Sequence, residues 1–294
     1  MAAEPMLNRE FLEKLERLTI LWQKSFAGLV GGHILSRLAG PGQEFLDHRN
    51  FHNGDDLRAV NWRAYLRLEK LFLKMFQTEP RVPLRMLLDT SDSMLTYEGA
   101  KFEYARRLAA ALCYVGLVRL DSIEVHGFTR RISKRLISSG GRHRFPGVMD
   151  AIAAIPAGGP TDYHAMARDF IESYPRRGLV IVISDFLDDR GCERALEYLA
   201  DFGHELMLLQ VWAPQDRTPP WLGELELRDA ETGERLKLDF DQAARTRYTR
   251  AFDEFSQTIQ TVALRSGGRY AGLSTDQPLE EVIFGELIRA RGIA

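Results

Sequence analysis

From about residue 83 onward, short apolar runs alternate with longer amphipathic stretches. The runs ending at Asp89 and Ser184 are almost continuously apolar, which is typical of strands covered on both faces. Because stretches with helical spacing separate such runs, the pattern predicts a doubly wound α/β fold with a mainly parallel sheet. Strands are expected at 85–89, 122–128, 178–184, 205–212 and 268–273, and helices at 102–120, 147–155, 162–174, 192–202, 241–264 and 279–288.

Two parts of the chain depart from this alternation. Residues 223–240 carry apolar positions of period two on each side of a Glu-Thr-Gly turn, which predicts an inserted β-hairpin. Residues 5–30 have apolar side chains at helical spacing and predict an amphipathic helix, and 31–80 hold turn signals and short strands. We therefore expect an N-terminal extension over 1–82 and an α/β domain over 83–294.

The composition is that of an ordinary globular protein. Of the 294 residues, 45% are hydrophobic and 27% are charged, which excludes a largely disordered or fibrous chain. The formal net charge of −2 lacks the basic excess of a general nucleic-acid binder, so no nucleic-acid partner is expected. The two distant cysteines, Cys113 and Cys192, exclude a disulfide framework and fit a reducing compartment.

Nothing in the hydropathy pattern predicts a membrane segment. The longest apolar runs are strand-sized, far short of the roughly 18 to 20 residues that a span needs. The N-terminus carries acidic and basic residues from its start and has no apolar signal-peptide core. We therefore expect a cytoplasmic protein with no integral membrane segment.

Oxygen-bearing side chains follow one of the predicted strands directly. Asp89-Thr90-Ser91-Asp92-Ser93 begins where the strand at 85–89 ends, and ligands of open parallel sheets lie beyond the carboxyl ends of the strands. Alternation lets Asp89, Ser91 and Ser93 converge, while Thr90 and Asp92 point away. Hard oxygens of this kind suit Mg²⁺ or Mn²⁺. Alone, the segment indicates a turn and helix N-cap more than a metal site.

Two further loops are expected at the same edge of the sheet. A Gly-Gly-Pro segment leads to Thr161 at a helix start, and Asp185 follows the strand at 178–184. Two Asp charges roughly balance a divalent cation and leave room for one anionic oxygen from outside. The sequence thus predicts a site that binds Mg²⁺, or Mn²⁺ or Ca²⁺, and recruits a carboxylate from a partner or substrate. Its expected ligands are Asp89, Ser91, Ser93, Thr161 and Asp185.

These five residues resemble the metal-ion-dependent adhesion site of von Willebrand factor A-type domains. An upstream segment resembles the bacterial DUF58 family, in which it precedes an A-type domain; its matching residues are Gly42-Gln43-Glu44-Phe45, His48-Arg49, Gly54-Asp55-Asp56, Arg58 and Val60-Asn61-Trp62. The family usually has Asp where this chain has Asn61. The resemblance implies a von Willebrand factor A-like domain over 83–294. It also implies a chaperone-like partnership with a MoxR-type AAA+ ATPase, because genes of the two families are commonly neighbours.

Three functions remain open at this point. The leading hypothesis is a non-enzymatic, metal-dependent interaction module whose cation binds an acidic residue of a partner, the MoxR-type ATPase or its client. A metal-dependent phosphatase or other hydrolase is an alternative. Against it, Ser91 stands where a haloacid-dehalogenase-type phosphatase has its acid Asp, and the Gly-x-Ser-x-Gly elbow is absent. The third hypothesis is a metal-free structural scaffold.

Overall fold

The computed structural model describes residues 7–18, 20, 44–51, 60–77, 84–118, 122–138, 141–188, 190–291 and 293. The chain divides into two compact units, one formed by Met1–Lys24 with Val82–Ala294 and the other by Ser25–Arg81. This division differs from the expected one at the N-terminus. The described residues among the first 24 go with the α/β unit and not with an extension that runs to residue 82.

The larger unit is built on a six-stranded sheet in the order β10-β7-β6-β3-β4-β5. Five strands run parallel: β3 (Leu84–Asp89), β4 (Ile123–Phe128), β6 (Leu179–Ser184), β7 (Glu205–Trp212) and β10 (Arg269–Ser274). The predicted α/β class with a mainly parallel sheet is confirmed. The sequence pattern did not predict β5 (Ile132–Ser138), which pairs antiparallel with β4, because Lys134 and Arg135 interrupt its apolar run.

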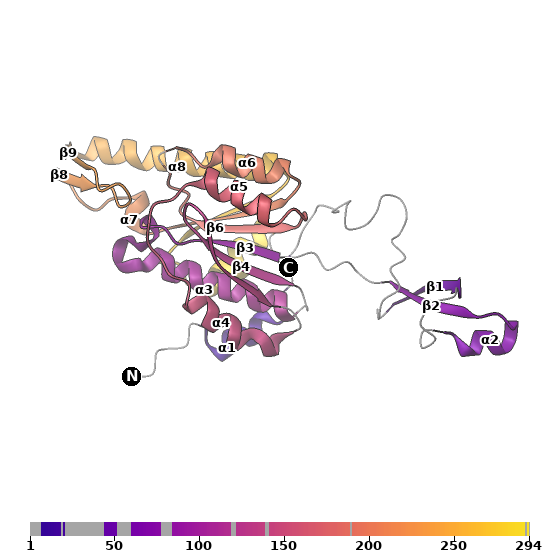
Figure 1. The fold of residues 1–294 in the computed structure, drawn as a ribbon. Coiled ribbons are helices and arrows are strands. Elements are labelled where there is room, and N and C mark those ends of the chain that lie inside the picture. Colours follow the sequence, from indigo (N-terminus) through magenta and orange to yellow (C-terminus); the bar gives the residue numbers. More distant parts are fainter. Residues whose placement is uncertain are drawn as a thin grey trace. The chain divides into compact units, whose positions relative to one another are not determined.

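Helices cover both faces of this sheet (Figure 1). One face carries α1 (Arg9–Leu15), α3 (Thr96–Val118), α4 (Phe145–Ala153), α9 (Leu279–Glu281) and η4 (Val282–Leu287). The other carries α5 (Tyr163–Ser173), α6 (Glu193–Asp201) and α8 (Gln242–Arg265). Along β6, Ile181 and Ile183 enter the first core, while Val180 and Val182 enter the second. Alternate side chains of one apolar strand thus fill two cores.

The amphipathic helix expected at 5–30 is much shorter in the structure. Helix α1 begins after the N-cap Asn8 and ends at Leu15. Ile20 then forms an isolated antiparallel bridge with Ile293, which a continuing helix would not allow. The remainder of that prediction, residue 19 and residues 21–30, lies outside the described residues.

The other short elements connect this framework, and two helices are irregular. Tyr97, Glu98 and Gly99 have left-handed backbone angles at the start of α3, before its regular part begins. The helix predicted at 279–288 forms as the short α9 followed by the π-helical η4. The remaining short elements are η2 (Ser93–Leu95), η3 (Arg142–Arg144) and α7 (Pro214–Arg217).

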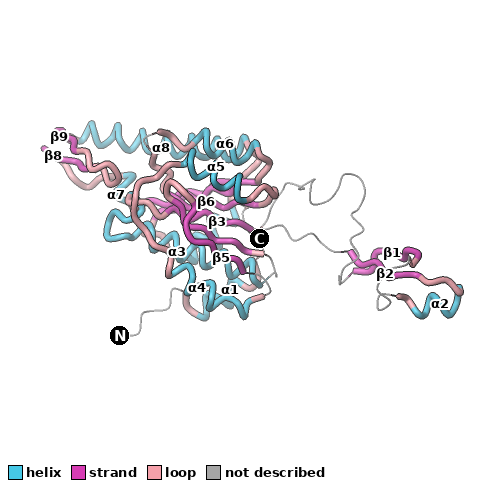
Figure 2. The backbone as a smooth tube through the Cα atoms, viewed as in Figure 1, coloured by secondary structure: helices cyan, strands magenta, loops and turns pink. Residues whose placement is uncertain are grey.

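The predicted hairpin is present as β8 (Gly223–Arg228) and β9 (Arg235–Phe240), which pair antiparallel (Figure 2). Its turn is held by Asp229, whose Oδ1 accepts hydrogen bonds from the amides of Glu231 at 3.0 Å and Thr232 at 2.6 Å. Gly233 supplies the left-handed residue that the turn needs, with a φ of 73°. The hydrogen bonds of Asp229 and the backbone of Gly233 therefore place Glu231 at the tip of the hairpin.

The smaller unit contains β1 (Glu44–Asn50), α2 (Trp62–Leu68) and β2 (Phe72–Gln77), with the two strands paired antiparallel. Asn61 is the N-cap of α2, because its side chain accepts a hydrogen bond from the Ala64 amide at 3.3 Å. Since Asp and Asn cap helices about equally well, this position tolerates either residue locally. The Gly54-Asp55-Asp56 motif lies outside the described residues.

Candidate functional site

The predicted ligands gather at a switch point of the sheet. Strand β3 lies between β4, the next strand of the sheet in sequence, and β6, which the chain reaches only after α4 and α5. Asp89 is the last residue of β3, and Asp185 directly follows β6. Both carboxylates are therefore at the carboxyl ends of neighbouring parallel strands, where crevices of open α/β sheets bind ligands.

The loop after β3 turns two hydroxyls toward each other. The Oγ atoms of Ser91 and Ser93 lie 3.0 Å apart, and Oδ1 of Asp89 accepts the Ser91 amide at 2.9 Å. The Thr90 hydroxyl instead donates to the carbonyl oxygen of Phe128 at 2.9 Å. In an octahedral Mg²⁺ site with bonds of about 2.1 Å, adjacent ligand oxygens are about 3.0 Å apart. The spacing of Ser91 and Ser93 fits two adjacent ligands.

The loop that carries Thr161 is hydrogen-bonded to the loop after β3. The Gly158 amide donates to the Thr90 carbonyl at 2.7 Å, and the Asp92 amide donates to the Gly159 carbonyl at 3.0 Å. Gly158 and Gly159 have φ angles of +128° and +103°, which side chains with a Cβ rarely adopt. The glycines thus permit the close approach of two loops that are far apart in sequence.

Asp185 is joined to a buried lysine that the sequence pattern did not indicate. Nζ of Lys101 lies 2.8 Å from Oδ2 of Asp185 and 3.2 Å from Oδ2 of Asp216. Burial lowers the pKa of Lys101, but the two carboxylates outweigh it, so the pKa is raised and the ammonium stays charged. Oδ1 of Asp185 accepts the Leu187 amide at 3.1 Å. Because each carboxylate oxygen can accept more than one contact, Asp185 remains available as a ligand.

Two further hydroxyls hold Asp89 from the opposite side. Its Oδ2 accepts hydrogen bonds from Oγ of Ser184 at 2.5 Å and from Oη of Tyr163 at 3.1 Å, and these two hydroxyls also contact each other. Ser184 directly precedes Asp185, and Tyr163 lies two residues after Thr161, so closeness in sequence was the available signal for them. They orient the carboxylate and leave Oδ1 facing the Ser91 loop.

The electrostatics of Asp89 favour a cation. Complete burial, with the nearby charge of Asp185, raises the pKa of Asp89 to about 7, against the opposing hydrogen bonds from Ser184 and Ser91. A carboxyl held in this way is stabilised either by a proton or by a positive ion. Together with the hydroxyl spacing, this observation makes the donor set fit a hard divalent cation.

This candidate site depends on hydroxyl groups more than on charged ligands. Among the residues that the structure describes, no group of three or more His, Cys, Asp and Glu side chains is arranged to hold a metal. The structure instead joins Asp89, Ser91 and Ser93 in one hydrogen-bonded loop, with Asp185 at the next strand end and Thr161 on the adjoining loop. All five side chains are at least nine-tenths buried.

Thr161 has a partner from the distant hairpin. Its amide donates to Oε2 of Glu231 at 2.7 Å, and its hydroxyl donates to Oε1 of the same residue at 2.8 Å. Burial raises the pKa of Glu231, and the charges of Asp185 and Asp188 add to the rise against the hydrogen bonds from Thr161. The sequence pattern indicated Glu231 as a turn residue, and nothing local signals its contact with Thr161.

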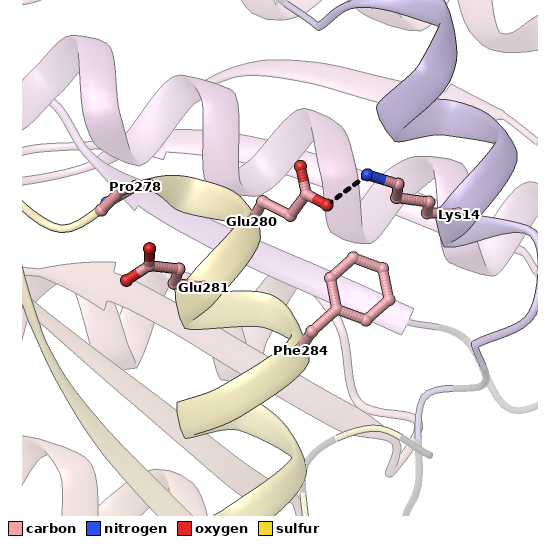
Figure 3. Close-up of a pocket in the computed structure, with 5 residues that line it drawn as sticks. All are labelled: Lys14, Pro278, Glu280, Glu281 and Phe284. Carbon is pink, nitrogen blue, oxygen red and sulfur yellow. Dashed lines mark hydrogen bonds and ion pairs between the residues drawn. The ribbon is translucent and has the colours of Figure 1, made fainter.

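A separate pocket of about 460 Å³ lies between α1 and the α9–η4 segment (Figure 3). Lys14 and Glu280 face each other there, with Nζ 2.7 Å from Oε1, and Phe284 packs below them. Both charged side chains are half-exposed, so the pair contributes little stability. The pocket contains no predicted metal ligand and marks where α1 docks.

These observations define an α/β protein with a buried cluster of hydroxyls and carboxylates at the carboxyl edge of its sheet. The family described as "Protein of unknown function DUF58" matches residues 47–258, and the chain belongs to this family. Among relatives, "Uncharacterized protein Rv1480" of Mycobacterium tuberculosis and "Uncharacterized protein Mb1516" of Mycobacterium bovis are each 26% identical over 288 residues, covering 95% of this chain and 89% of the relative.

A solved structure is also similar at a greater distance. The crystal structure of the conserved hypothetical protein BatB from Bacteroides thetaiotaomicron has a TM-score of 0.43 and 16% sequence identity, covering 71% of this chain and 98% of BatB. Within the described part of the chain, no helix has both the length and the apolar character needed to cross a membrane.

Proposed function

We propose that this protein is a metal-dependent protein-interaction module with a von Willebrand factor A-type domain. The observation that carries the proposal is the Ser91–Ser93 hydroxyl pair, 3.0 Å apart, beside the buried carboxylate of Asp89. Hydroxyl pairs at that spacing suit adjacent positions around Mg²⁺, and Mn²⁺ or Ca²⁺ accept the same oxygen donors. The chain acts by binding, not as an enzyme.

Each residue has a distinct part in this proposal. Asp89, Ser91, Ser93 and Thr161 would hold the ion through oxygen atoms, and Asp185 would add a second negative charge. Ser184 and Tyr163 orient Asp89, while Lys101 limits the negative charge around Asp185. When bound, the cation supplies a positive centre that attracts a carboxylate oxygen. The natural ligand is therefore an acidic side chain of a partner protein.

A MoxR-type AAA+ ATPase, or its client, is the proposed partner. This choice rests on the DUF58 resemblance, which implies a shared role in chaperone-like assembly or maturation. An acidic residue on the ATPase or client would complete the ion's coordination, so their association would depend on the metal.

The two alternative functions account for less of the site. For a phosphatase, the residue two positions after Asp89 should be an acid, but Ser91 pairs its hydroxyl with Ser93. A metal-free scaffold does not require an ionisable side chain at this buried position. Burial raises the pKa of Asp89, and burying an Asn or Ser in its place would cost less free energy. Turnover of a phosphate ester that is lost in Asp89→Ala would favour the hydrolase.

Calorimetric titration of Mg²⁺ and Mn²⁺ into chelator-treated protein tests the proposal. We expect one saturable site that disappears in Asp89→Ala and remains in Asp92→Ala, a matched control in the same loop. Purified MoxR-type ATPase should then bind the wild-type chain in Mg²⁺ and not in EDTA. No binding of metal with or without the ATPase would overturn the proposal.

A further inference from the structure

The hairpin tip contacts the candidate site at Thr161 through a single side chain. Both carboxylate oxygens of Glu231 are hydrogen-bonded to Thr161, one to its amide and one to its hydroxyl. Residues 161 and 231 are 70 positions apart in the chain. The contact therefore brings an acidic group of the chain itself to a residue that we assign to the metal site.

The spacing of this contact matches that of the serine pair. Oε1 of Glu231 lies 2.8 Å from Oγ1 of Thr161, close to the roughly 3.0 Å between adjacent oxygens around Mg²⁺. The Thr161 hydroxyl gives its proton to Glu231, so its lone pairs remain free for an ion.

The hairpin is held in a way that permits its release. Its base is anchored where the buried Phe240 packs edge-to-face on Tyr248, with ring centroids 6.3 Å apart. Its two strands are largely exposed, including Leu227 and Leu236 at 44% and 62%. A two-stranded hairpin without a buried face is marginally stable by itself. The polar contact of Glu231 with Thr161 therefore matters for the position of the tip.

We propose that Glu231 is an internal ligand of the metal site. When a cation is bound, its carboxylate would take the coordination position that an acidic partner residue would use, and the β8–β9 hairpin would then cover the site until a partner displaces it. This inference rests on the proposed function, because it requires that the site bind a divalent cation. It makes partner binding a competition between two carboxylates, one of the same chain and one from outside.

Three variants of the hairpin turn separate coordination from other effects. Glu231→Gln removes the charged ligand with little change of shape. Glu231→Asp keeps the charge but shortens its reach by one methylene group. Glu234→Gln makes the same chemical change as the first variant at another acidic residue of the turn and is the matched control. Thermal unfolding in EDTA verifies that every variant is folded.

Mg²⁺ titration by calorimetry and amide hydrogen exchange over residues 223–240 are the two measurements. We expect Glu231→Gln and Glu231→Asp to weaken Mg²⁺ binding tenfold or more, while Glu234→Gln matches the wild type. Mg²⁺ should slow exchange at the turn in the wild type and in Glu234→Gln only.

The outcomes distinguish the two proposals. No Mg²⁺ binding by any form of the chain overturns both of them. Binding that depends on Asp89 but is equal in the wild type and Glu231→Gln, with hairpin exchange indifferent to Mg²⁺, overturns the internal ligand alone. Tighter binding by Glu231→Gln also overturns it, because Glu231 would then hold Thr161 away from the ion.

Discussion

Nζ of Lys101 lies 2.8 Å from Oδ2 of Asp185, and both side chains are almost fully buried, at 1% and 2% exposure. The ammonium also lies 3.2 Å from Asp216, whose Oδ2 accepts the Ala213 amide. The chain thus places one positive charge of its own between two carboxylates beside the candidate metal site. A cation added to this site would be the second one there, and both would offset the same cluster of acids.

Replacing Lys101 by Met should destabilise the protein strongly. Removing one partner of a buried ion pair leaves an uncompensated charge, which typically costs about 3–5 kcal/mol. Urea unfolding in EDTA should show this loss, and Mg²⁺ should restore part of it. Lys14→Met, which removes a half-exposed ion pair with Glu280, should have a much smaller effect. Equal losses in the two variants would contradict this account of the buried pair.

Asp89 should make the metal-free protein less stable as pH rises. Its pKa is about 7 in the folded state, against roughly 3.9 for an unfolded Asp. Between these values the folded state binds more protons than the unfolded state, so the unfolding free energy falls as pH increases. The fall is at most about 1.4 kcal/mol per pH unit for one group.

Urea unfolding at pH 5 and pH 7.5 in EDTA measures this dependence. In Asp89→Asn the unfolding free energy should fall less as pH rises, because the amide does not ionise. Saturating Mg²⁺ should also reduce this fall in the wild type, since the ion stabilises the ionised carboxylate. The same pH dependence in the wild type and in Asp89→Asn would show that Asp89 has an ordinary pKa.

The three hydroxyls of the loop after β3 should differ in their effect on metal binding. Ser91→Ala and Ser93→Ala should each weaken Mg²⁺ binding tenfold or more in calorimetry, because each removes an oxygen of the paired set. Thr90→Val removes a hydroxyl that donates to the Phe128 carbonyl. It should cost about 1 kcal/mol of stability and leave the Mg²⁺ affinity unchanged. An equal loss of Mg²⁺ affinity in the three variants would indicate that the substitutions act by disrupting the fold of the loop and not by removing ligands.

Two glycines should respond in opposite ways to substitution by alanine. A Cβ at Gly268 would lie 2.3 Å from the Leu206 carbonyl oxygen, so Gly268→Ala must displace backbone at the start of β10. We expect a loss of about 1–3 kcal/mol in the unfolding free energy. Gly147, in helix α4, has open space around the same position, and Gly147→Ala should stabilise by up to about 1 kcal/mol. Thermal unfolding of the two variants measures both effects.

Sequence patterns correctly predicted the strands and the hairpin whose formation depends on neighbouring residues. The continuous apolar run of β6 follows from its burial between two cores, and the hairpin follows from alternating apolar residues around a glycine turn. The edge strand β5 has charged residues in its run, so periodicity did not reveal it. Helix α1 is shorter than its apolar spacing predicted, because Ile20 pairs with Ile293 near the opposite end of the chain.

The sequence by itself determined which oxygen donors follow each strand, because the end of a strand and the turn after it depend on neighbouring residues. Asp89, Ser91 and Ser93 belong to this local part. Only the tertiary structure decided that Lys101 pairs with Asp185 and that Glu231 reaches Thr161. Those contacts join residues 84 and 70 positions apart, and their energies exist only after the sheet has brought separate segments together. The positions of the donor residues after the strands are thus set by the local sequence. The balance of charge around them and the contact of the hairpin with Thr161 depend on the folded chain.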